Sequence, residues 1–409
     1  MRKTLSKILL VVSLIAFGLF ACDQPTTNLN QNKSSDNEIA PKPGQVIDGQ
    51  YIVVFKKQTT KGKTLAGDVE GVKALRNRVF TDYNIENDAV ISKYNVALKG
   101  FAARLDESKV ANLRKDDRIA YLEKDRVLTL SPPCGTPTNP CDGGGGGGTS
   151  GQTTPWGITR VGGPTASSGT AWIIDTGVDL DHPDLNVDAS RSVTFVSKGK
   201  DSKSANDNNG HGTHVAGTIA AKDNGIDVVG VAAGATVVAV KVLDQRGSGS
   251  YSDVIAGIDY VAQNASSGDV ANMSLGGPTS QALDDAVRNA ADAGVMFAIA
   301  AGNDSDDANN YSPSRVEYHN VWTVSATDES DAFASFSNYS GPTDPPIEFA
   351  APGVSVLSLW KDGGTNTISG TSMATPHVTG LLLVTGGNPT TDGYASSDPD
   401  GDPDPIAHN

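Results

Sequence analysis

Cysteine, positive charge and long apolar runs are scarce in this chain. Only 3 of its 409 residues are cysteines, so it forms one disulfide at most. The formal net charge is −15, which argues against nucleic acid as a partner. The apolar run at residues 8–20 is too short to span a bilayer. Hydrophobic residues still make up 38% of the chain, enough to bury a sizeable core, and the length suits two folded units joined by linkers.

The N-terminus has the pattern of an export signal. A basic start precedes the short apolar run, so we predict that residues 1–21 are a signal peptide. The run ends in Leu19-Phe20-Ala21-Cys22, which resembles a bacterial lipoprotein box. That resemblance implies lipidation of Cys22, with an ordinary secretory signal as the alternative. Residues 22–49 are mostly polar and are expected to be a tether after the lipidated cysteine.

The rest of the chain divides into a small unit, a linker, a large unit and a tail. Residues 50–130 combine strand-like and helix-like stretches, as in a small α+β unit. Residues 131–154 contain six consecutive glycines and form a linker, which is expected to hold a proteolytic processing site. Residues 155–384 alternate apolar strands with helices, which predicts a parallel sheet covered on both faces. Residues 385–409 are acidic and rich in Gly and Pro, and we expect a disordered tail.

Three separate segments carry residues that fit nucleophilic catalysis. Ser372 lies among small residues where an apolar helix begins, Asp175 ends an apolar strand, and His211 starts a helix between two glycines. A serine needs a base, so we predict that His211 takes the Ser372 proton while Asp175 orients the imidazole. Metal binding by His211 with His214 is the alternative.

The order Asp, His, Ser resembles that of the subtilisin-like serine proteases, in particular the proteinase K branch. The segments that carry this resemblance are Ala171-Trp-Ile-Ile-Asp-Thr-Gly, Asn209-Gly-His-Gly-Thr-His and Gly370-Thr-Ser-Met-Ala-Thr-Pro-His. The resemblance covers residues 155–384 and implies a three-layer α/β fold around a parallel sheet. An esterase fits less well, because Ala374 stands where the Gly-x-Ser-x-Gly motif has its last glycine.

The small unit resembles the inhibitory prodomain of the same family. The similar segments are Tyr51-Ile-Val-Val-Phe, Gly100-Phe-Ala-Ala-Arg-Leu and Tyr121-Leu-Glu-Lys-Asp. The resemblance implies a ferredoxin-like unit that assists folding and then blocks the cleft with its last strand, near residues 128–130. An unrelated ferredoxin-like module is the alternative. Residues 1–152 carry 21 Lys and Arg against 16 Asp and Glu, whereas the remainder carries 11 against 31. Attraction between the two halves at low salt is one reading of this difference, and a solvated acidic surface that keeps an exported protein soluble is the alternative.

The same resemblance assigns the remaining site residues. Asn303 matches the side-chain donor to the oxyanion, although by itself it could be a turn residue, and the Ser372 backbone N–H would be the second donor. Substrate peptides in this family add as a strand to exposed backbone edges, which small residues leave unobstructed. The residues expected to bind substrate are Gly247, Ser248, Gly249, Ser274, Leu275, Gly276, Ala300, Ala301 and Gly302.

These pocket walls are small and uncharged, so we predict preference for aliphatic or aromatic residues on the acyl side of the cut bond. Preference for Arg or Lys would need an acidic floor, which these segments lack. The chemistry requires no cofactor. The resemblance allows for structural calcium, with Val321 and Glu348 as candidates, and a surface glutamate is the alternative reading of Glu348.

Together these features predict a serine endopeptidase that is exported as a lipid-anchored zymogen in the cell envelope. Its partners are protein and peptide substrates, its own prodomain and, through Cys22, a membrane. Processing after the prodomain would release the enzyme outside the cell or into the periplasm. Cys134 and Cys141 are predicted to form a disulfide, with free thiols as the alternative, and a cut between them would leave the enzyme tethered. The rival function is an inactive binding or surface protein with the same fold.

Overall fold

The computed structural model of the chain describes residues 42–56, 59–60, 63–64, 68–130, 151–341 and 347–409. Cys22, Cys134 and Cys141 lie outside these residues, as do the predicted signal peptide and most of the linker. Within the described residues, no helix is both long and apolar enough to cross a membrane.

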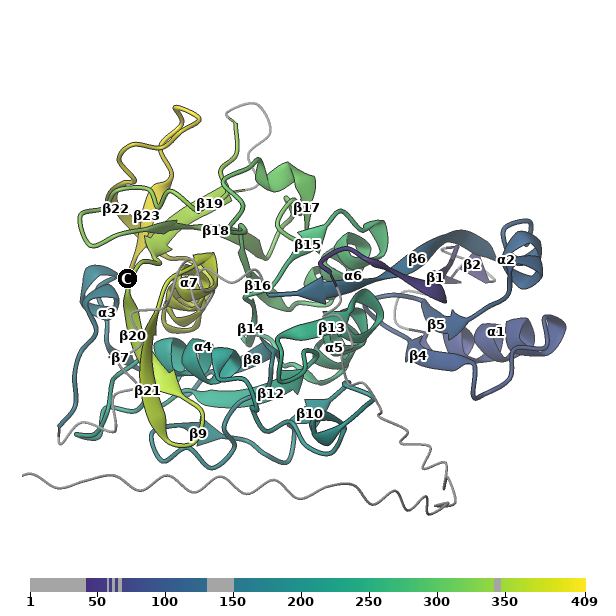
Figure 1. Cartoon of the computed structure of the whole chain (residues 1–409), viewed down its shortest axis with the longest axis horizontal. Helices are drawn as coiled ribbons and strands as arrows, with labels where there is room; N and C mark the ends of the chain where they lie inside the picture. Colours follow the sequence, from purple (N-terminus) through teal and green to yellow (C-terminus); the bar gives the residue numbers. More distant parts are fainter. Residues whose placement is uncertain (1–41, 57–58, 61–62, 65–67, 131–150, 342–346) are drawn as a thin grey trace, which may run out of the picture. The chain divides into compact units, whose positions relative to one another are not determined.

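Residues 46–129 form a β-α-β-β-α-β unit. Four antiparallel strands pair in the order β6-β1-β5-β4, with helices α1 and α2 beside them (Figure 1). This is the predicted ferredoxin-like unit, although its first strand starts inside the expected tether. The elements are β1 (Val46–Phe55), β2 (Thr59–Thr60), β3 (Lys63–Thr64), α1 (Val69–Asp82), β4 (Val90–Tyr94), β5 (Gly100–Arg104), α2 (Glu107–Leu113) and β6 (Ile119–Thr129).

Residues 151–409 form a second unit around a largely parallel sheet. Its strands lie in the order β10-β12-β8-β14-β16-β18-β19-β23-β22, and all pairs are parallel except the last. The sheet strands are β8 (Thr170–Asp175), β9 (Asn186–Val187), β10 (Val193–Thr194), β12 (Thr236–Lys241), β14 (Val270–Met273), β16 (Met296–Ala300), β18 (Val321–Thr327), β19 (Ile347–Pro352), β22 (Thr390–Tyr394) and β23 (Pro405–His408).

Helices cover both faces of this sheet, which gives the predicted three-layer α/β fold (Figure 1). The helices are α3 (Trp156–Arg160), α4 (His211–Ala220), α5 (Tyr251–Asn264), α6 (Gln281–Asp292) and α7 (Thr371–Thr385), with 3-10 turns η1 (Lys200–Ser202) and η2 (Ala308–Asn310). Short strands outside the sheet are β7 (Thr165–Ala166), β11 (Ala232–Ala233), β13 (Ser248–Ser250), β15 (Gly277–Pro278), β17 (Tyr311–Ser312), β20 (Val356–Trp360) and β21 (Gly364–Ile368).

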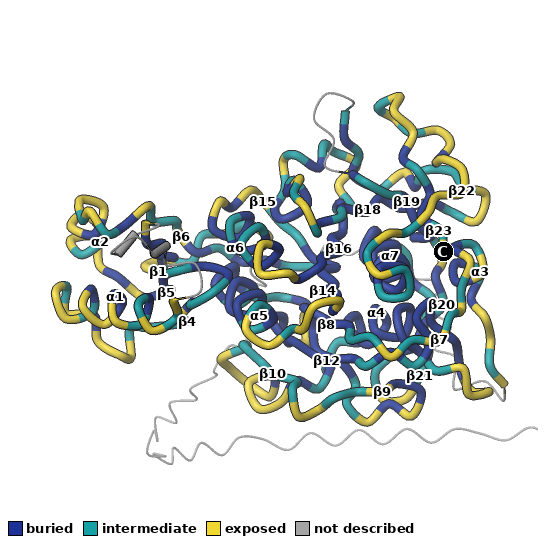
Figure 2. Tube along the Cα trace, turned by 180° about the vertical axis from the view of Figure 1, so that it is seen from behind, coloured by how far each residue is buried: buried dark blue, intermediate teal, exposed yellow. Residues whose placement is uncertain are grey.

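Alternation along β8 explains how one strand serves two layers. Trp172 and Ile174 pack toward α5 and α6, whereas Ala171 and Ile173 pack toward α4 and Met373 of α7. Successive strand side chains point to opposite faces, so a strand buried on both faces reads as a continuous apolar run. In Figure 2 these central strands and α7 are buried, while α1 and α2 expose their outer sides.

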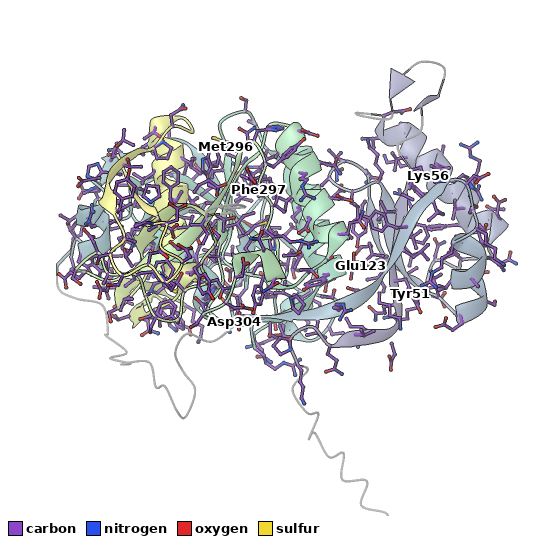
Figure 3. All side chains as sticks on the ribbon, turned by 90° about the horizontal axis from the view of Figure 1, so that it is seen from above. Tyr51, Lys56, Glu123, Met296, Phe297 and Asp304 are labelled. Atoms are coloured by element: carbon purple, nitrogen blue, oxygen red, sulfur yellow. The ribbon has the colours of Figure 1, made fainter. Side chains whose placement is uncertain are left out.

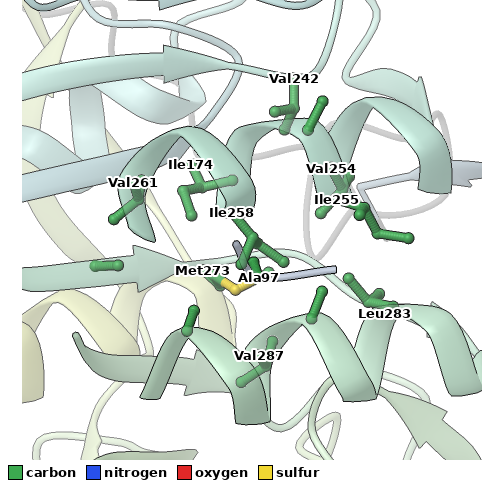
Figure 4. Close-up of a cluster of buried hydrophobic side chains, with 14 of the residues drawn as sticks. Ala97, Ile174, Val242, Val254, Ile255, Ile258, Val261, Met273, Leu283 and Val287 are labelled. Carbon is green, nitrogen blue, oxygen red and sulfur yellow. The ribbon is translucent and has the colours of Figure 1, made fainter. Parts of the chain in front are cut away.

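The small unit uses the same alternation to join the large one. Tyr51 and Val53 of β1 pack with α1 and α2, whereas Ile52 and Val54 belong to the cluster built around α5 and α6. Figure 4 shows Ala97 of the small unit among the side chains of these two helices. The sheet of the small unit therefore covers the outer surface of α5 and α6 with one face and packs against its own helices with the other.

The prediction of a disordered tail at residues 385–409 was wrong. Strand β23 pairs in parallel with β19 through Ala350 and Ile406, and β22 pairs with β23 as the outermost strand. Ile406 and Ala407 are fully buried. Two apolar residues are too short a run to show a strand period, and only the edge of the sheet beside them makes their burial possible.

The tail also closes onto the start of the large unit. Arg160 of α3 donates Nε to Asp331 Oδ1 at 2.7 Å and Nη2 to the Asp392 carbonyl oxygen of β22 at 2.7 Å. The Asn409 N–H donates to the Val161 carbonyl oxygen at 2.9 Å. Through these contacts the tail is fastened to α3 and the residues that follow it, an ordered role that its acidic composition did not predict.

Candidate active site

Asp175 and His211 meet at the carboxyl end of the sheet. Asp175 is the last residue of β8 and is fully buried, and His211 is the first residue of α4. His211 Nδ1 lies 2.8 Å from Asp175 Oδ1 and 3.0 Å from Oδ2. Burial lowers the pKa of His211, but the charge of Asp175 and its hydrogen bond outweigh burial and leave the pKa raised. The pair therefore holds one imidazole tautomer, with Nε2 facing away from the carboxylate.

Asp207, which sequence reasoning missed, fixes the start of helix α4. Its carboxylate accepts N–H groups of Gly210 at 2.9 Å and Thr213 at 3.0 Å, and the Thr213 hydroxyl at 2.7 Å. The residue before the helix, Gly210, has a φ of 119° and offers no side-chain cap. The buried Asp207 carboxylate takes the place of the missing cap, and its negative charge interacts favourably with the positive end of the helix dipole. The Asp-x-x-Gly-His spacing was the available signal.

Ser372 lies in the first turn of α7, which packs against α4. Its Oγ donates to the Ser274 carbonyl oxygen at 3.1 Å, and Ser274 Oγ donates back to the Ser372 carbonyl oxygen at 2.9 Å. Among the described residues, no hydrogen bond joins Ser372 to His211. A rotation of the Ser372 side chain is needed to make that bond, and such bonds are often long before substrate binds.

Asn303 is oriented by the residue that precedes Ser372. The N–H and hydroxyl of Thr371 both donate to Asn303 Oδ1, at 2.8 and 3.0 Å. Because the oxygen takes both donors, the amide NH₂ is left to face the cavity that Asn303 shares with Ser372. Asn338 fixes the same loop, with its Nδ2 donating to the Ala301 carbonyl oxygen at 3.0 Å and its Oδ1 accepting the Asp304 N–H at 2.9 Å.

A cavity of about 240 Å³ opens beside Ser372 and Asn303. Its lining includes all six residues predicted for the specificity pocket: Ser274, Leu275, Gly276, Ala300, Ala301 and Gly302. It also includes Asp304 and Tyr311, which the sequence reasoning did not select. The signal for Asp304 was its position directly after Asn303. The walls are small and mostly apolar, as expected, but one carboxylate stands among them.

The three residues predicted at the other substrate edge lie against the prodomain. Strand β6 pairs antiparallel with β13, with Ser248 opposite Thr129 and Gly249 opposite Leu128. The Leu130 N–H donates to the Gly247 carbonyl oxygen at 2.9 Å. The end of the prodomain thus lies along the predicted substrate edge and reaches the cavity, which Leu130 also lines. A peptide strand at this edge would be excluded while β6 is in place.

Carboxylates fasten the prodomain to helices α5 and α6. Asp125, fully buried, accepts the N–H and hydroxyl of Ser252 at 3.1 and 2.6 Å, and Glu123 accepts the Ala282 N–H at 3.0 Å. Each prodomain acid therefore sits at the N-terminus of one helix, where its charge is favoured. In the opposite sense, Asp259 of α5 accepts prodomain backbone N–H groups, including that of Val96 at 2.7 Å.

No cluster of three or more His, Cys, Asp or Glu side chains in the described residues fits a metal ion. His214 points away from His211, with Nε2 at 3.0 Å from the Val356 carbonyl oxygen, so the structure does not support a His211–His214 metal pair. Two places nevertheless offer hard oxygen donors. At Glu348, burial raises the pKa to about 8, and its carboxylate shares a cavity of about 410 Å³ with Val321 and Glu317.

Asp184, which was not selected from the sequence, offers the second place. Its side chain is fully buried, Oδ2 has no hydrogen-bond partner among the described residues, and burial raises its pKa to about 6. Asn224 Nδ2 donates to Asp184 Oδ1 at 2.8 Å, and Gln152 Oε1 accepts the Asn224 N–H at 2.8 Å. Asp184 Oδ2 is therefore an orphaned carboxylate oxygen, the kind of ligand that Ca²⁺ prefers.

Comparison with known proteins decides the family. A family model described as “Subtilase family” matches residues 172–391, more than half of the chain. The chain belongs to the subtilase family. A second model, “Peptidase inhibitor I9”, matches residues 50–131 of this subtilase, the unit identified above as the prodomain. The predicted fold class, a subtilisin-like domain preceded by an inhibitory prodomain, is confirmed.

Several relatives of this subtilase are named as serine proteases. “Alkaline serine exoprotease A” of Vibrio alginolyticus is 40% identical, over 85% of this chain and 62% of that protein, so this chain spans less than two thirds of its length. “Extracellular serine proteinase” of Thermus sp. is 40% identical, over 83% and 80%. “Proteinase R” of Parengyodontium album is 35% identical, over 90% and 87%. The prediction of a serine protease from the proteinase K-like branch is confirmed.

Proposed function

We propose that this subtilase hydrolyses peptide bonds within proteins through an acyl-enzyme on Ser372. The observation that carries the proposal is the convergence of the Asp175–His211 pair, Ser372 and the Asn303 amide at one end of the sheet. His211 Nε2 takes the Ser372 proton as Oγ attacks the carbonyl carbon. The Asn303 NH₂ and the Ser372 N–H donate to the oxyanion, and His211 then protonates the leaving amine. Water then attacks the acyl-enzyme with His211 as its base, and the acid product leaves as the proton returns to Ser372 Oγ.

The test compares purified wild type with Ser372→Ala by intact mass and N-terminal sequencing. We expect wild type to lose its first ~130 to 155 residues, because a linker rich in glycine is readily cut, and the variant to stay full length. A variant processed at the same bond without added protease would contradict the proposal. Labelling with a fluorophosphonate separates the rival function, since an inactive binding protein would not react at Ser372.

The prodomain is part of this proposal as an intramolecular inhibitor. Its strand β6 occupies the β13 edge and lines the cavity at Ser372. Binding through backbone hydrogen bonds makes it a substrate mimic, and activity requires its removal. Full-length Ser372→Ala protein should therefore fail to bind an uncleaved substrate peptide, whereas the same variant with its prodomain removed by added protease should bind it.

For substrate preference, we extend the proposal to aliphatic and aromatic residues on the acyl side of the bond. Leu275, Ala300 and Ala301 give the cavity an apolar wall, and its volume of about 240 Å³ suits a large side chain. Tetrapeptide nitroanilides that differ only in that residue test the preference. Faster hydrolysis of a Gly peptide than of a Phe peptide would contradict the proposed preference.

Structural calcium at the Asp184 and Glu348 places is a further part of the proposal. Bound Ca²⁺ would neutralise a buried carboxylate at each, held by Asp184 in one and by Glu348 and the Val321 carbonyl in the other. EDTA should lower the unfolding temperature by about 5 to 10 °C. Asp184→Asn and Glu348→Gln show which site binds the calcium. In a variant that has lost one site, EDTA should lower the unfolding temperature by less than it does in wild type. Calcium titration by calorimetry gives an independent readout.

Lipid anchoring at Cys22 and a disulfide between Cys134 and Cys141 stay proposals that rest on the sequence. Both would act before or at processing: the lipid would hold the precursor at a membrane, and the cut would release the enzyme. Mass spectrometry of the membrane-bound precursor, beside Cys22→Ser, tests the lipid. A mature N-terminus beyond Cys141 would rule out tethering through the disulfide.

A further inference from the structure

The cavity beside Ser372 carries one charged side chain. Among the described residues that line it, Asp304 is acidic and none is Lys, Arg or His. The other lining residues form apolar or small polar walls, with Leu275 and Ala300 among them. A long side chain that enters the cavity would therefore meet aliphatic surface and one carboxylate.

Asp304 is held in place by its backbone and not through its carboxylate. Its N–H donates to Asn338 Oδ1 at 2.9 Å, and the same oxygen accepts the Asp306 N–H at 3.2 Å. Asn338 is itself fully buried and donates to the Ala301 carbonyl oxygen. The loop that presents the carboxylate is thus fixed to the cavity wall by one side chain. Figure 3 shows Asp304 at the edge of the large unit, on the side that β6 approaches.

The Asp304 carboxylate lacks a partner of its own. Within the described part of the chain, no hydrogen bond or ion pair involves its oxygens, and it is exposed to solvent at the rim. Its neighbours add negative charge: Asp306 Oδ2 accepts the Tyr311 hydroxyl at 3.2 Å, and Tyr311 also lines the cavity. Burial, followed by the charge of Asp304, raises the pKa of Tyr311 to about 12, so that ring stays neutral. The rim therefore holds uncompensated negative charge.

We infer that this cavity accepts Lys and Arg as well as apolar residues on the acyl side of the cut bond, with Asp304 as the residue that selects the cation. The inference rests on the proposed function and refines its substrate class. The methylene stem of Lys or Arg packs on Leu275 and Ala300, as long cationic side chains do on apolar surface, and the head group lies by Asp304. The absence of an acidic floor did not exclude such substrates, because the acid lies at the rim.

The test uses the processed wild-type enzyme and two tetrapeptide nitroanilides that differ only in Arg or citrulline at the acyl position. Citrulline has the size of Arg without its charge, so the ratio of their kcat/KM values isolates the charge. We expect wild type to favour Arg by about three- to tenfold, as for a partly exposed ion pair. Asp304→Asn should bring the ratio to about one. Raising the salt from 0.05 to about 1 M should shrink the wild-type ratio without any substitution.

Asp362→Asn is the matched control. It removes the same charge from an exposed turn outside the cavity, where Asp362 pairs with Lys361. That variant should keep the wild-type ratio, which separates a local effect from one of net charge. Asp304→Ser serves as a second variant if Asp304→Asn does not fold.

The outcomes distinguish this inference from the function on which it rests. A wild-type enzyme that cuts neither these peptides nor the matching Phe peptide removes the proposed function and the inference together. An enzyme that cuts the Phe peptide but shows an Arg-to-citrulline ratio of one, or a ratio unaltered in Asp304→Asn, overturns the inference alone.

Discussion

The catalytic centre and the prodomain interface both depend on buried carboxylates, but they satisfy them differently. Asp175 and Asp207 find their partners within the large unit, in His211 and in the first turn of α4. Asp125 and Asp259 find most of theirs across the boundary between the two units. The hydrogen bonds that order the catalytic residues therefore do not depend on the prodomain, whereas those of Asp125 and Asp259 form only while the prodomain is bound to the large unit. Substitutions should separate activity from inhibition.

The largest effect should come from Asp175→Asn. An amide in place of the carboxylate allows the wrong imidazole tautomer and does not stabilise the imidazolium, so kcat should fall about 10⁴-fold. Prodomain affinity should not change, because no hydrogen bond or ion pair joins Asp175 to a described prodomain residue. Peptide hydrolysis by the processed enzyme and inhibition by added prodomain measure the two quantities. Equal losses of kcat and of prodomain affinity would contradict the proposed separation of activity from inhibition.

Asn303→Ala should follow. The substitution removes one donor to the oxyanion and should lower kcat about 10²- to 10³-fold, with KM little changed. Thr371 would then lose the acceptor for two donors, so thermal unfolding must be measured as a control. A loss confined to KM would mean that Asn303 binds substrate and does not act on the transition state.

Asp259→Ala should affect the interface and spare catalysis. It leaves the N–H groups of Asn95, Val96 and Ala97 without their acceptor, which should weaken prodomain binding by about 10- to 100-fold. The measurement is inhibition of the processed enzyme by added prodomain. Asp362→Ala, on an exposed turn, is the matched control, and hydrolysis of small peptides should be normal in both variants.

Per pH unit, the smallest effect should be a pH dependence of prodomain affinity. Burial, together with the nearby charge of Asp125, raises the pKa of Asp253 to about 7 in the complex. Without the prodomain that pKa should move toward its usual value of about 3.9. Binding then takes up a proton, so affinity should fall by up to about tenfold per unit as pH rises from about 4 to about 7, and level off above. Asp253→Asn should flatten the profile, because it removes the titrating carboxyl, and a rise of affinity with pH would contradict this account.

Local sequence patterns were sufficient for most of the elements that carry the site. The apolar run ending at Asp175 and the helix starting at His211 appear where the sequence predicts them, because a buried parallel strand and a glycine-flanked helix start are local signals. The two small-residue segments of the predicted pocket also line one cavity. The family resemblance made that convergence predictable.

Other features depend on contacts between residues far apart in the chain. Asn338 and Asp184 are polar residues in loops, and nothing in their immediate sequence shows that each is buried. The final strand was missed for the same reason, since Ile406 is buried only by the sheet edge beside it.

By itself, the sequence determined the subtilase family, the two folded units and the identity of the candidate Asp, His, Ser and Asn, because local motifs carry the family resemblance and periodicity along the chain indicates the folded units. Only the tertiary structure decided that the acidic tail completes the sheet, that the prodomain is fastened by carboxylates on helix ends, and that Asp304 stands at the rim of an otherwise uncharged cavity. Charge and burial at these places are set by what folds against them, and that information is distributed over the whole chain.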